Sequence, residues 1–298
     1  MILVSGATGF IGSRLLQRLA AGGAQPLRGL SRSAGSAALP SGVEAVSVDL
    51  TEAGSLAAAL AGVSTVVHTA AITANLKEPY PGAYDRINRV GTENLVAAAR
   101  ESGATRIVLL SGLLSGPVRK GSYMATRVAM EQAVRQSGIP YLILQPSVLF
   151  GDGAEFVAAL ARLARVSPVL PLLGPSSLRF QPLWIEDLLR CLEACLAPGA
   201  EMDREIPLGG AEQVSFREVL ETICAALGVR RLLLPLPLPL AAIQARGMAA
   251  SLPHPPLTPA TLELFGFDNS TELDSVERNF GFRPRGFREH LRAHGVDG

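Results

Sequence analysis

Charged residues are scarce in this chain of 298 residues, at 18% against about 25% in typical soluble domains. The two signs nearly cancel, since 27 Lys and Arg against 26 Asp and Glu leave a formal net charge of +1. A bulk attraction to nucleic acid or to an anionic membrane is therefore not expected. Cysteine is also rare: Cys191, Cys195 and Cys224 form no CxxC pair, so we expect buried, reduced thiols in a reducing compartment.

The chain also lacks a long uninterrupted apolar run. The stretch over 232–245 has 14 residues and is broken by three prolines, whereas a membrane-spanning helix needs about 20 apolar residues. The first residues show no basic region before their apolar run, and glycines already stand at Gly6 and Gly9, unlike a signal peptide. We expect a cytoplasmic protein without a transmembrane segment. Hydrophobic residues make up 48% of the chain, which excludes a disordered protein.

Short apolar runs alternate with helical patterns over residues 1–147. Strands are predicted over 2–5, 26–30, 43–49, 65–68, 106–110 and 141–144, and helices over 10–21, 52–61, 86–102 and 122–137. Runs such as TVVH and IVLL are apolar on both faces, as expected where helices cover both sides of a sheet. This pattern predicts an α/β fold with a Rossmann-type, doubly wound parallel sheet.

The sequence pattern changes beyond residue 147, where strand and helix patterns no longer alternate regularly. Prolines crowd into 166–182 and 235–259, while 155–165, 186–196 and 216–227 keep helical patterns. We expect a smaller, mostly helical lobe for substrate or partner over 148–298, with the helix at 186–196 packing either there or on the first domain. The Leu/Pro alternation at 232–240 predicts an extended or polyproline stretch. Its apolar character makes 232–243 a candidate docking surface for a protein partner or a membrane.

Three glycines between the first predicted strand and helix form the most informative motif. Gly6 allows a sharp turn, Gly9 allows close approach of a pyrophosphate, and Gly12 allows tight packing of helix on strand. The amino terminus of the helix adds amide donors and partial positive charge. The motif predicts a dinucleotide site. Its expected contacts are Gly6, Thr8, Gly9, Phe10, Ile11 and Gly12.

The residues after the second predicted strand bear on which dinucleotide is bound. An NAD site would place an acidic residue there for the ribose hydroxyl, but residues 13–42 contain no Asp or Glu. Arg28 and Arg32 are instead available to pair with a 2′-phosphate, assisted by Ser31 or Ser33. This favours NADP(H) over NAD(H). The alternative is that both arginines are ordinary surface charges.

Two residues after the third predicted strand are candidates for the adenine end of the cofactor. Asp49 and Leu50 are placed to meet the adenine edge. Asp49 could also cap the helix expected to begin near Thr51. Both interpretations stay open at this point.

Several segments resemble the extended and atypical short-chain dehydrogenase/reductases, the group that includes the NAD-dependent epimerases and dehydratases. They are the GxxGxxG spacing itself, HTAA at 68–71, NRVGT at 88–92 and PSVLFG at 146–151. More narrowly, IPYLIL at 139–144, FQPLWIED at 180–187 and LTP at 257–259 are similar to the branch that contains the NADH:ubiquinone oxidoreductase accessory subunit.

The resemblance implies a Rossmann domain with NAD(P) at the strand ends, below a variable carboxy-terminal lobe. It adds Thr69, Ala70, Ala71, Arg127 and Pro146 to the expected cofactor contacts. It also implies that many members of the branch bind a nucleotide although their catalytic set is lost or altered.

Chemistry in this superfamily rests on a Tyr-x-x-x-Lys pair and a Ser or Thr. Here Ser111 follows the fifth predicted strand, Tyr123 opens the next helix, and Arg127 stands at the lysine position. Ser111 would bond the substrate oxygen, Tyr123 would transfer a proton, and Arg127 would orient the ribose and lower the pKa of the phenol. Arginine has a wider, more diffuse charge, and Glu131 one turn later could draw it away. Lys120 is an alternative cation.

Other polar residues give weaker signals. His68 ends the fourth predicted strand near the expected nicotinamide, where a structural role is the commoner one. His290 and His294 have metal-binding spacing, but no third ligand stands nearby, so we expect no metal. The segment 179–184 either contacts substrate or anchors the second lobe.

The leading hypothesis is an NADP(H)-binding oxidoreductase that transfers a hydride to or from a small, apolar carbonyl or alcohol. One alternative is a non-catalytic, nucleotide-binding accessory or redox-sensing subunit of a larger assembly. The other alternative is a sugar-nucleotide epimerase or dehydratase. A diphosphate substrate would need a clearer basic cluster in the second lobe than the sequence offers.

Overall fold

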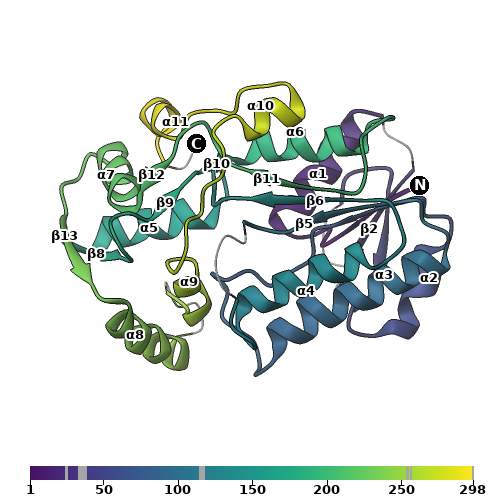
Figure 1. Cartoon of the computed structure of the whole chain (residues 1–298), viewed down its shortest axis with the longest axis horizontal. Coiled ribbons are helices and arrows are strands. Elements are labelled where there is room, and N and C mark those ends of the chain that lie inside the picture. The colour runs from purple at the N-terminus through teal and green to yellow at the C-terminus, as the bar shows by residue number, and fades with distance from the viewer. Residues whose placement is uncertain (24–25, 33–38, 114–117, 253–254, 256, 297–298) are drawn as a thin grey trace.

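The strands of the largest sheet come from both halves of the chain. The computed structural model describes residues 1–23, 26–32, 39–113, 118–252, 255 and 257–296. Its largest sheet has seven parallel strands in the order β11-β6-β5-β4-β1-β2-β3 (Figure 1). These are β1 (Ile2–Ser5), β2 (Leu27–Ser31), β3 (Val43–Ser47), β4 (Thr65–His68), β5 (Arg106–Leu110), β6 (Tyr141–Pro146) and β11 (Arg204–Leu208). The Rossmann-type sheet predicted from the alternating pattern is confirmed.

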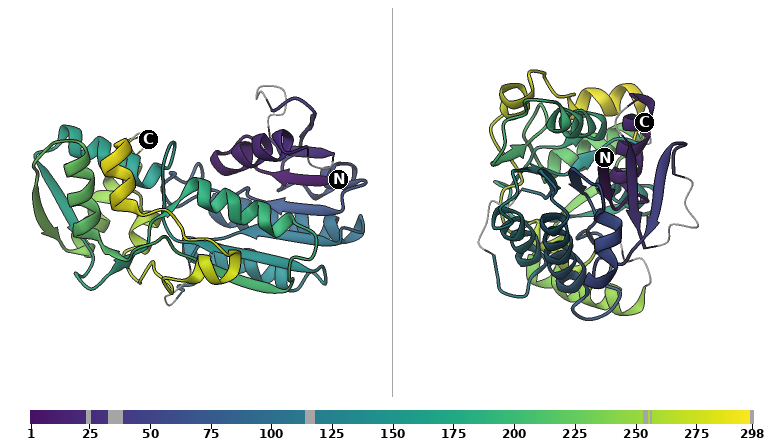
Figure 2. Two further views of the ribbon diagram at one scale, coloured as in Figure 1. Left: turned by 90° about the horizontal axis from the view of Figure 1, so that it is seen from above. Right: turned by 90° about the vertical axis from the view of Figure 1, so that its right-hand side faces the viewer.

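Helices cover both faces of this sheet, as the doubly apolar strands predicted (Figures 1 and 2). On β5, Val108 packs in the core shared with α1 (Phe10–Ala21) and α6 (Ile185–Leu196). Its neighbours Ile107 and Leu109 pack on the opposite face. The helices of that face are α2 (Leu56–Leu60), α3 (Gly91–Glu101) and α4 (Tyr123–Arg135).

The carboxy-terminal half returns to the first unit. Strand β11 pairs with β6, and α6 packs on α1 through Leu188, Leu192 and other buried residues of the same core. Helix α10 (Ser275–Phe280) lies over β11 and α6. A single cut at residue 147 therefore does not separate the two parts, because 183–208 and 275–282 belong to the sheet unit.

The second part is mostly helical around an aromatic core. Phe180 packs against Phe156, Phe216 and Phe265 with ring centroids 5.5–5.9 Å apart. The helices of this part are α5 (Glu155–Val166), α7 (Phe216–Ala226), α8 (Leu238–Ser251), α9 (Pro259–Glu263) and α11 (Phe287–His294). Its short strands are β7 (Leu149–Phe150), β8 (Val169–Leu173), β9 (Arg179–Phe180), β10 (Leu183–Trp184), β12 (Val214–Ser215) and β13 (Leu232–Leu236).

Two segments differ from their predicted form. The Leu/Pro stretch is a strand, β13, paired in parallel with β8, and it turns into α8 rather than continuing as polyproline. The helix predicted over 86–102 opens with a π-helical turn at Asp85–Val90 before α3. That turn carries Asn88, whose buried side chain bonds the backbone of Ile72.

His68 joins three elements inside the fold. Its Nδ1 lies 2.6 Å from the hydroxyl of Ser5 on β1, and its Nε2 lies 2.8 Å from the hydroxyl of Thr92 on α3. Because the Thr92 hydroxyl donates to the carbonyl of Asn88, the ring donates from Nε2 and accepts at Nδ1. Burial, reinforced by the charge of Arg127, lowers the pKa of His68 to about 3. The structural interpretation of this histidine is thus the one that the contacts support.

The buried neutral ring predicts a pH dependence of stability. Below pH 6.5 the unfolded chain binds a proton at His68 that the folded chain excludes until about pH 3. Stability from this group is thus complete above pH 6.5 and falls by up to about 1.4 kcal/mol for each pH unit between these values. We expect urea unfolding of the native protein to show this added slope between pH 6.5 and 5. His68→Gln should lower stability at pH 7.5 and flatten the slope, and an unchanged slope would contradict the assignment.

Candidate functional site

A cavity of about 1170 Å³ lies between the carboxyl edge of the large sheet and the second part. Its lining includes the residues that follow β1, β2, β3, β4, β5 and β6. Ligands of open α/β sheets bind at this edge. Every described residue that the sequence predicted for the cofactor lines this cavity, with the exception of Arg28.

The glycine loop has the close approaches that its spacing predicted. Gly6 has a φ of +73°, and a Cβ there would lie 2.9 Å from the Cα of Ala70. A Cβ on Gly12 would lie 2.2 Å from the carbonyl oxygen of Gly6. The amide of Gly9 donates to that same oxygen at 2.8 Å. No side chain fits at positions 6 or 12 without a backbone shift, so the close packing of the loop requires glycine at both positions.

Helix α1 starts directly from this loop. Its N-cap is Gly9, in extended conformation and without a capping side chain. The first-turn amides of an α-helix have no partner inside the helix, so those of Phe10, Ile11 and Gly12 face the cavity. Such an amino terminus attracts a phosphate group through its amides and its partial positive charge.

The end of β2 carries Ser31 and Arg32, both in the cavity lining. The hydroxyl of Ser31 is buried and has no hydrogen-bond partner among the described residues, as expected of a group that meets a ligand. Arg32 is exposed at the rim of the same cavity. Ser33, the other serine considered for the phosphate, lies outside the described residues.

Arg28 was predicted to hold a phosphate, and this prediction is wrong. Its guanidinium is buried and donates to the carbonyl oxygens of Ala59 at 2.7 Å and Ala61 at 3.0 Å, and to Glu44 at 2.9 Å. All its contacts tie β2 to the end of α2 and to β3. Arg28 is therefore a structural cation.

Asp49 lies at the exposed edge of the cavity beside buried Leu50. Its carboxylate accepts a bond of 2.8 Å from the amide of Thr51, and this bond holds the pKa of the carboxyl below its usual range. This hydrogen bond between Asp49 and Thr51 thus stabilises the turn after β3. Asp49 does not cap α2, since that helix begins at Leu56 after a 3-10 turn.

Thr69, Ala70, Ala71 and Pro146 also line the cavity, and Thr69 and Ala70 lie directly against the glycine loop. The hydroxyl of Thr69 donates to the carbonyl of Ser5 at 2.7 Å, which joins the end of β4 to the end of β1. The resemblance implied all four residues as cofactor contacts, and all four line the cavity.

Ser111, Tyr123 and Arg127 line the same cavity from β5 and α4. The hydroxyl of Ser111 is buried and finds no hydrogen-bond partner in the part of the chain that the structure describes. The ring of Tyr123 meets that of Tyr84 edge-on at 5.3 Å. Arg127 is buried and donates to the carbonyl of Leu110 at 3.0 Å. The structure thus brings the three predicted catalytic residues to one cavity.

Glu131 does not draw Arg127 away, contrary to the concern that the i,i+4 spacing raised. Its carboxylate instead accepts from Arg135 at 2.7 Å and from Gln145 at 3.0 Å. The bonds found for the Arg127 side chain go to Leu110 and to the sulfur of Met130. Lys120 is exposed and is not among the residues that line the cavity.

Two residues that position α4 were missed in the sequence. Asn88 donates to the hydroxyl of Thr126 at 3.2 Å while holding the backbone of Ile72. Glu263 on α9 accepts from the amides of Tyr123 and Met124 at 3.1 and 3.0 Å, which places a negative charge at the amino terminus of α4. Asn88 lies in a quoted motif but had no role assigned. Glu263 is 140 residues from Tyr123 and gave no local signal.

The part of the cavity formed by the second lobe is apolar. Its lining comes from α5, β8, α7, β13, α8 and the segment around α9. The apolar lining residues are Phe156, Ala159, Leu160, Leu163, Val169, Pro171, Leu173, Phe216, Leu220, Leu234, Pro235, Leu236, Met248, Leu257, Leu264 and Phe265. Among the described residues of this lobe that line the cavity, Glu155 is the one with a charge. We call this part the apolar chamber.

Residues 179–184 are anchors of the second lobe. Gln181 is buried and donates to the carbonyl of Gly210 at 2.8 Å, and Trp184 stacks under the guanidinium of Arg285 at 4.5 Å. His290 and His294 stack on each other with ring centroids 4.7 Å apart. Within the described ranges, no group of three or more His, Cys, Asp and Glu could hold a metal ion.

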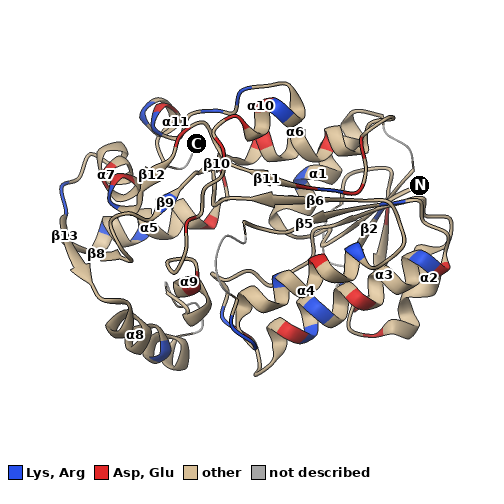
Figure 3. Ribbon diagram, in the orientation of Figure 1, with Lys and Arg blue, Asp and Glu red and all other residues tan. Residues whose placement is uncertain are grey.

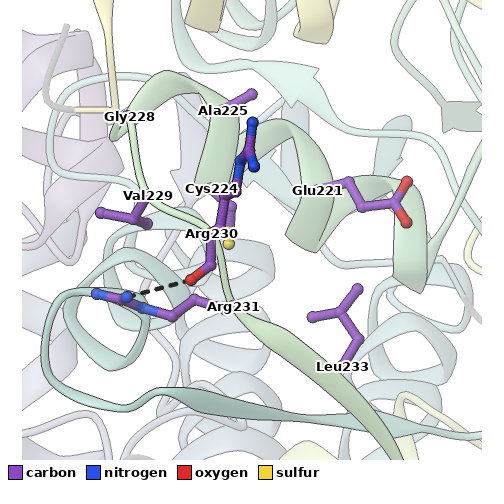
Figure 4. Close-up of a pocket in the computed structure, with 8 residues that line it drawn as sticks. All are labelled: Glu221, Cys224, Ala225, Gly228, Val229, Arg230, Arg231 and Leu233. Atoms are coloured by element: carbon purple, nitrogen blue, oxygen red, sulfur yellow. Dashed lines mark hydrogen bonds between the residues drawn. The ribbon is translucent and has the colours of Figure 1, made fainter.

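A second cavity, of about 560 Å³, lies at the end of α7 and the start of β13 (Figure 4). Glu221, Cys224 and the arginines Arg230 and Arg231 line it. Burial raises the pKa of the Cys224 thiol, which disfavours its reactive thiolate form. Cys191 and Cys195 are likewise free and buried, as predicted. None of the predicted site residues lines this cavity.

Comparisons with known proteins show the family of this chain. A family model described as NAD(P)H-binding matches residues 6–162. The chain is 32% identical over 200 residues to a ceramide reductase of Caulobacter vibrioides, covering 66% of this chain and 62% of that enzyme, which is less than two thirds of its length. It is 30% identical over 260 residues to a 2-alkyl-3-oxoalkanoate reductase of Stenotrophomonas maltophilia, covering 77% and 76%.

Similarity extends to a respiratory subunit and to the epimerase fold. The chain is 25% identical over 281 residues to the mitochondrial NADH dehydrogenase [ubiquinone] 1 alpha subcomplex subunit 9 of Arabidopsis thaliana, covering 91% of this chain and 68% of that subunit. A nucleoside-diphosphate-sugar epimerase from Staphylococcus aureus shares the fold, with a TM-score of 0.79 at 18% identity over 98% and 99% of the chains. The glycine loop, the parallel sheet and the match over residues 6–162 show that this chain belongs to the NAD(P)H-binding family and is an extended short-chain dehydrogenase/reductase.

Proposed function

We propose that the protein is an NADP(H)-dependent oxidoreductase that interconverts a carbonyl and an alcohol on an apolar substrate. One observation carries this proposal: the unpartnered hydroxyl of Ser111 lies in a cavity that also holds Tyr123 and Arg127 and that joins the glycine loop to the apolar chamber. A buried hydroxyl without a partner is costly unless a ligand completes it.

The residues present fit a pyridine dinucleotide. The close packing at Gly6 and Gly12 holds the start of α1 at the cavity, and Gly9 at the N-cap has no side chain to block a pyrophosphate from the α1 amides. Ser31 and Arg32 would hold a 2′-phosphate, because Ser31 has a free buried hydroxyl and Arg32 reaches the rim. When bound, the cofactor supplies or accepts the hydride.

The chain's own residues would handle the proton and the substrate oxygen. Ser111 donates a hydrogen bond to the oxygen, and the hydroxyl of Tyr123 gives or takes the proton. Arg127 supplies the positive charge one turn after Tyr123 on the same helix. Since Glu131 is engaged by Arg135 and Gln145, it does not compete for that charge.

The apolar chamber favours an apolar substrate over a sugar nucleotide. A diphosphate needs cationic or amide donors, and Glu155, the charged residue found in this part of the lining, has the opposite sign. The names of two relatives, a ceramide reductase and a 2-alkyl-3-oxoalkanoate reductase, describe reductases of lipid-like compounds. Both observations support an aliphatic carbonyl substrate.

A second candidate is a nucleotide-binding subunit without turnover. Arginine at the lysine position and the 25% identity to the plant NADH dehydrogenase subunit favour it. A subunit of this kind would have the same cofactor site, but its Tyr123 would transfer no proton. Kinetics on the native protein distinguishes the two.

The glycine loop predicts a position-specific loss of nucleotide affinity. Gly12→Ala places a Cβ 2.2 Å from the Gly6 carbonyl and should weaken binding of NADPH about tenfold or more, because the loop must shift. Gly54→Ala is the matched control, since a Cβ there meets nothing within 4 Å. Fluorescence titration measures both variants. Equal affinities would overturn the assignment of the loop.

The two arginines predict opposite phenotypes. Arg32→Ala should weaken NADPH binding about 10- to 100-fold and leave NADH binding nearly unchanged, because one charge-assisted bond to the 2′-phosphate is lost. Arg28→Met should lower the melting temperature and keep the ratio of NADPH to NADH affinity, since the carbonyls of Ala59 and Ala61 lose their donor. A ratio that moves with Arg28 and not with Arg32 would refute the proposal.

Tyr123 predicts the loss of turnover without loss of binding. Tyr123→Phe should reduce kcat on a panel of aliphatic ketones by about 10²-fold or more at unchanged NADPH affinity. Tyr84→Phe is the control, since its hydroxyl bonds the carbonyl of Leu76 and should be dispensable for proton transfer. Full activity of Tyr123→Phe would exclude the mechanism. NADPH binding with no turnover by the native protein would favour the subunit.

A further inference from the structure

Large apolar side chains are exposed next to one another along one edge of the second part. We define the apolar rim as Val166, Val169, Leu232, Leu234, Leu240 and Ile243. These residues come from α5, β8, β13 and α8, which adjoin at the left edge of Figure 1. Val169 and Leu232 are register partners in the β8–β13 pair, and Leu232 is 58% exposed. The rim is thus one surface rather than scattered residues.

The rim is continuous with the apolar chamber. Val169 and Leu234 are exposed on the surface and also line the cavity. Pro235 and Met248 continue the lining inward from β13 and α8. An apolar molecule at the rim would therefore reach the chamber without leaving apolar contacts.

Helix α8 carries apolar side chains both on the side that packs against the protein and on its outer side. Ala241 and Ala245 are buried against the protein, whereas Leu240 and Ile243 are exposed, Ile243 by 64%. Exposed apolar side chains that lie together on one surface normally mark an interaction site. We therefore expect an apolar partner to cover Leu240 and Ile243 on the outer side of α8.

The charge of this region points to the chemistry of that occupant. Residues 222–262 contain no Asp or Glu and three arginines, at 230, 231 and 246, although the whole chain carries only +1. Arg246 is exposed and follows Ile243 by three positions, so the two share a side of α8. Arg246 is the charged residue in the sequence of α8, a helix that is otherwise tan in Figure 3. Apolar side chains flanked by cations match the acyl boundary and the phosphates of an anionic lipid bilayer.

We propose that the apolar rim rests on the surface of an anionic lipid bilayer, with the mouth of the cavity toward the lipid. Attachment is peripheral: among the described helices, none is long and apolar enough to cross a membrane. An apolar substrate then passes from the bilayer into the chamber. This delivery rests on the proposed function, whereas the docking itself does not.

Vesicle flotation of the full chain tests the docking. We expect the protein to float with vesicles of phosphatidylcholine and phosphatidylglycerol in low salt, less at 0.5 M salt, and weakly with phosphatidylcholine alone. The double substitution Leu240→Asp, Ile243→Asp should reduce the bound fraction at least tenfold. Leu273→Asp is the matched control, because Leu273 is 56% exposed outside the rim and should bind like the native protein. Native-like NADPH affinity of each variant shows that it is folded.

The outcomes separate docking from function. A native protein that floats with neither vesicle, or a double variant that floats like the native protein, overturns the proposal. A native dimer that the double variant converts to a monomer, without vesicle binding, would make the rim a self-association surface and refute the membrane. Vesicle binding without ketone turnover would leave docking in place and defeat the proposed function.

Discussion

The glycine-loop end of the cavity depends on one close approach, in which the carbonyl oxygen of Gly6 fills the space that a side chain at position 12 would need. That approach brings the start of α1 against the end of β1 and turns the free amides of the helix toward the cavity. Thr69 locks β4 to β1 beside it, and His68 does the same one residue earlier. The polar ends of three elements are thereby fixed around a single opening.

The part of the cavity that contains Ser111 and Tyr123 also holds a buried cation, Arg127, and no acidic side chain among the described residues bonds it. Arg127 is held by the carbonyl of Leu110, while the nearby carboxylate of Glu131 is satisfied by Arg135 and Gln145. Replacing the usual lysine by arginine therefore keeps a positive charge facing the cavity. The same charge, added to burial, keeps His68 neutral and restricts it to a structural role. Charge placement at this site is a property of the surrounding network rather than of one residue.

Local patterns predicted the parts of the structure that depend on neighbours in sequence. The strands, the glycine loop and the cluster of Ser111, Tyr123 and Arg127 follow from periodicity, spacing and family resemblance. Arg28 was misjudged because it lies within β2, where its side chain reaches α2 and β3, whereas Arg32 lies beyond the strand end. The return of β11 to the sheet depends on contacts between distant segments, which periodicity does not encode.

Helix α9 joins the second part of the molecule to the sheet unit. Thr258 and Thr261 donate to the carbonyl of Ala74, and Glu263 caps the helix that begins with Tyr123. Residues at 257, 261, 264 and 265 from the same segment line the cavity. The second part, which lines the cavity, and the helix that carries Tyr123 are therefore not independent modules. A second part transplanted from a relative would fit this chain only if it brought an acceptor equivalent to Glu263 for the amides at the start of α4.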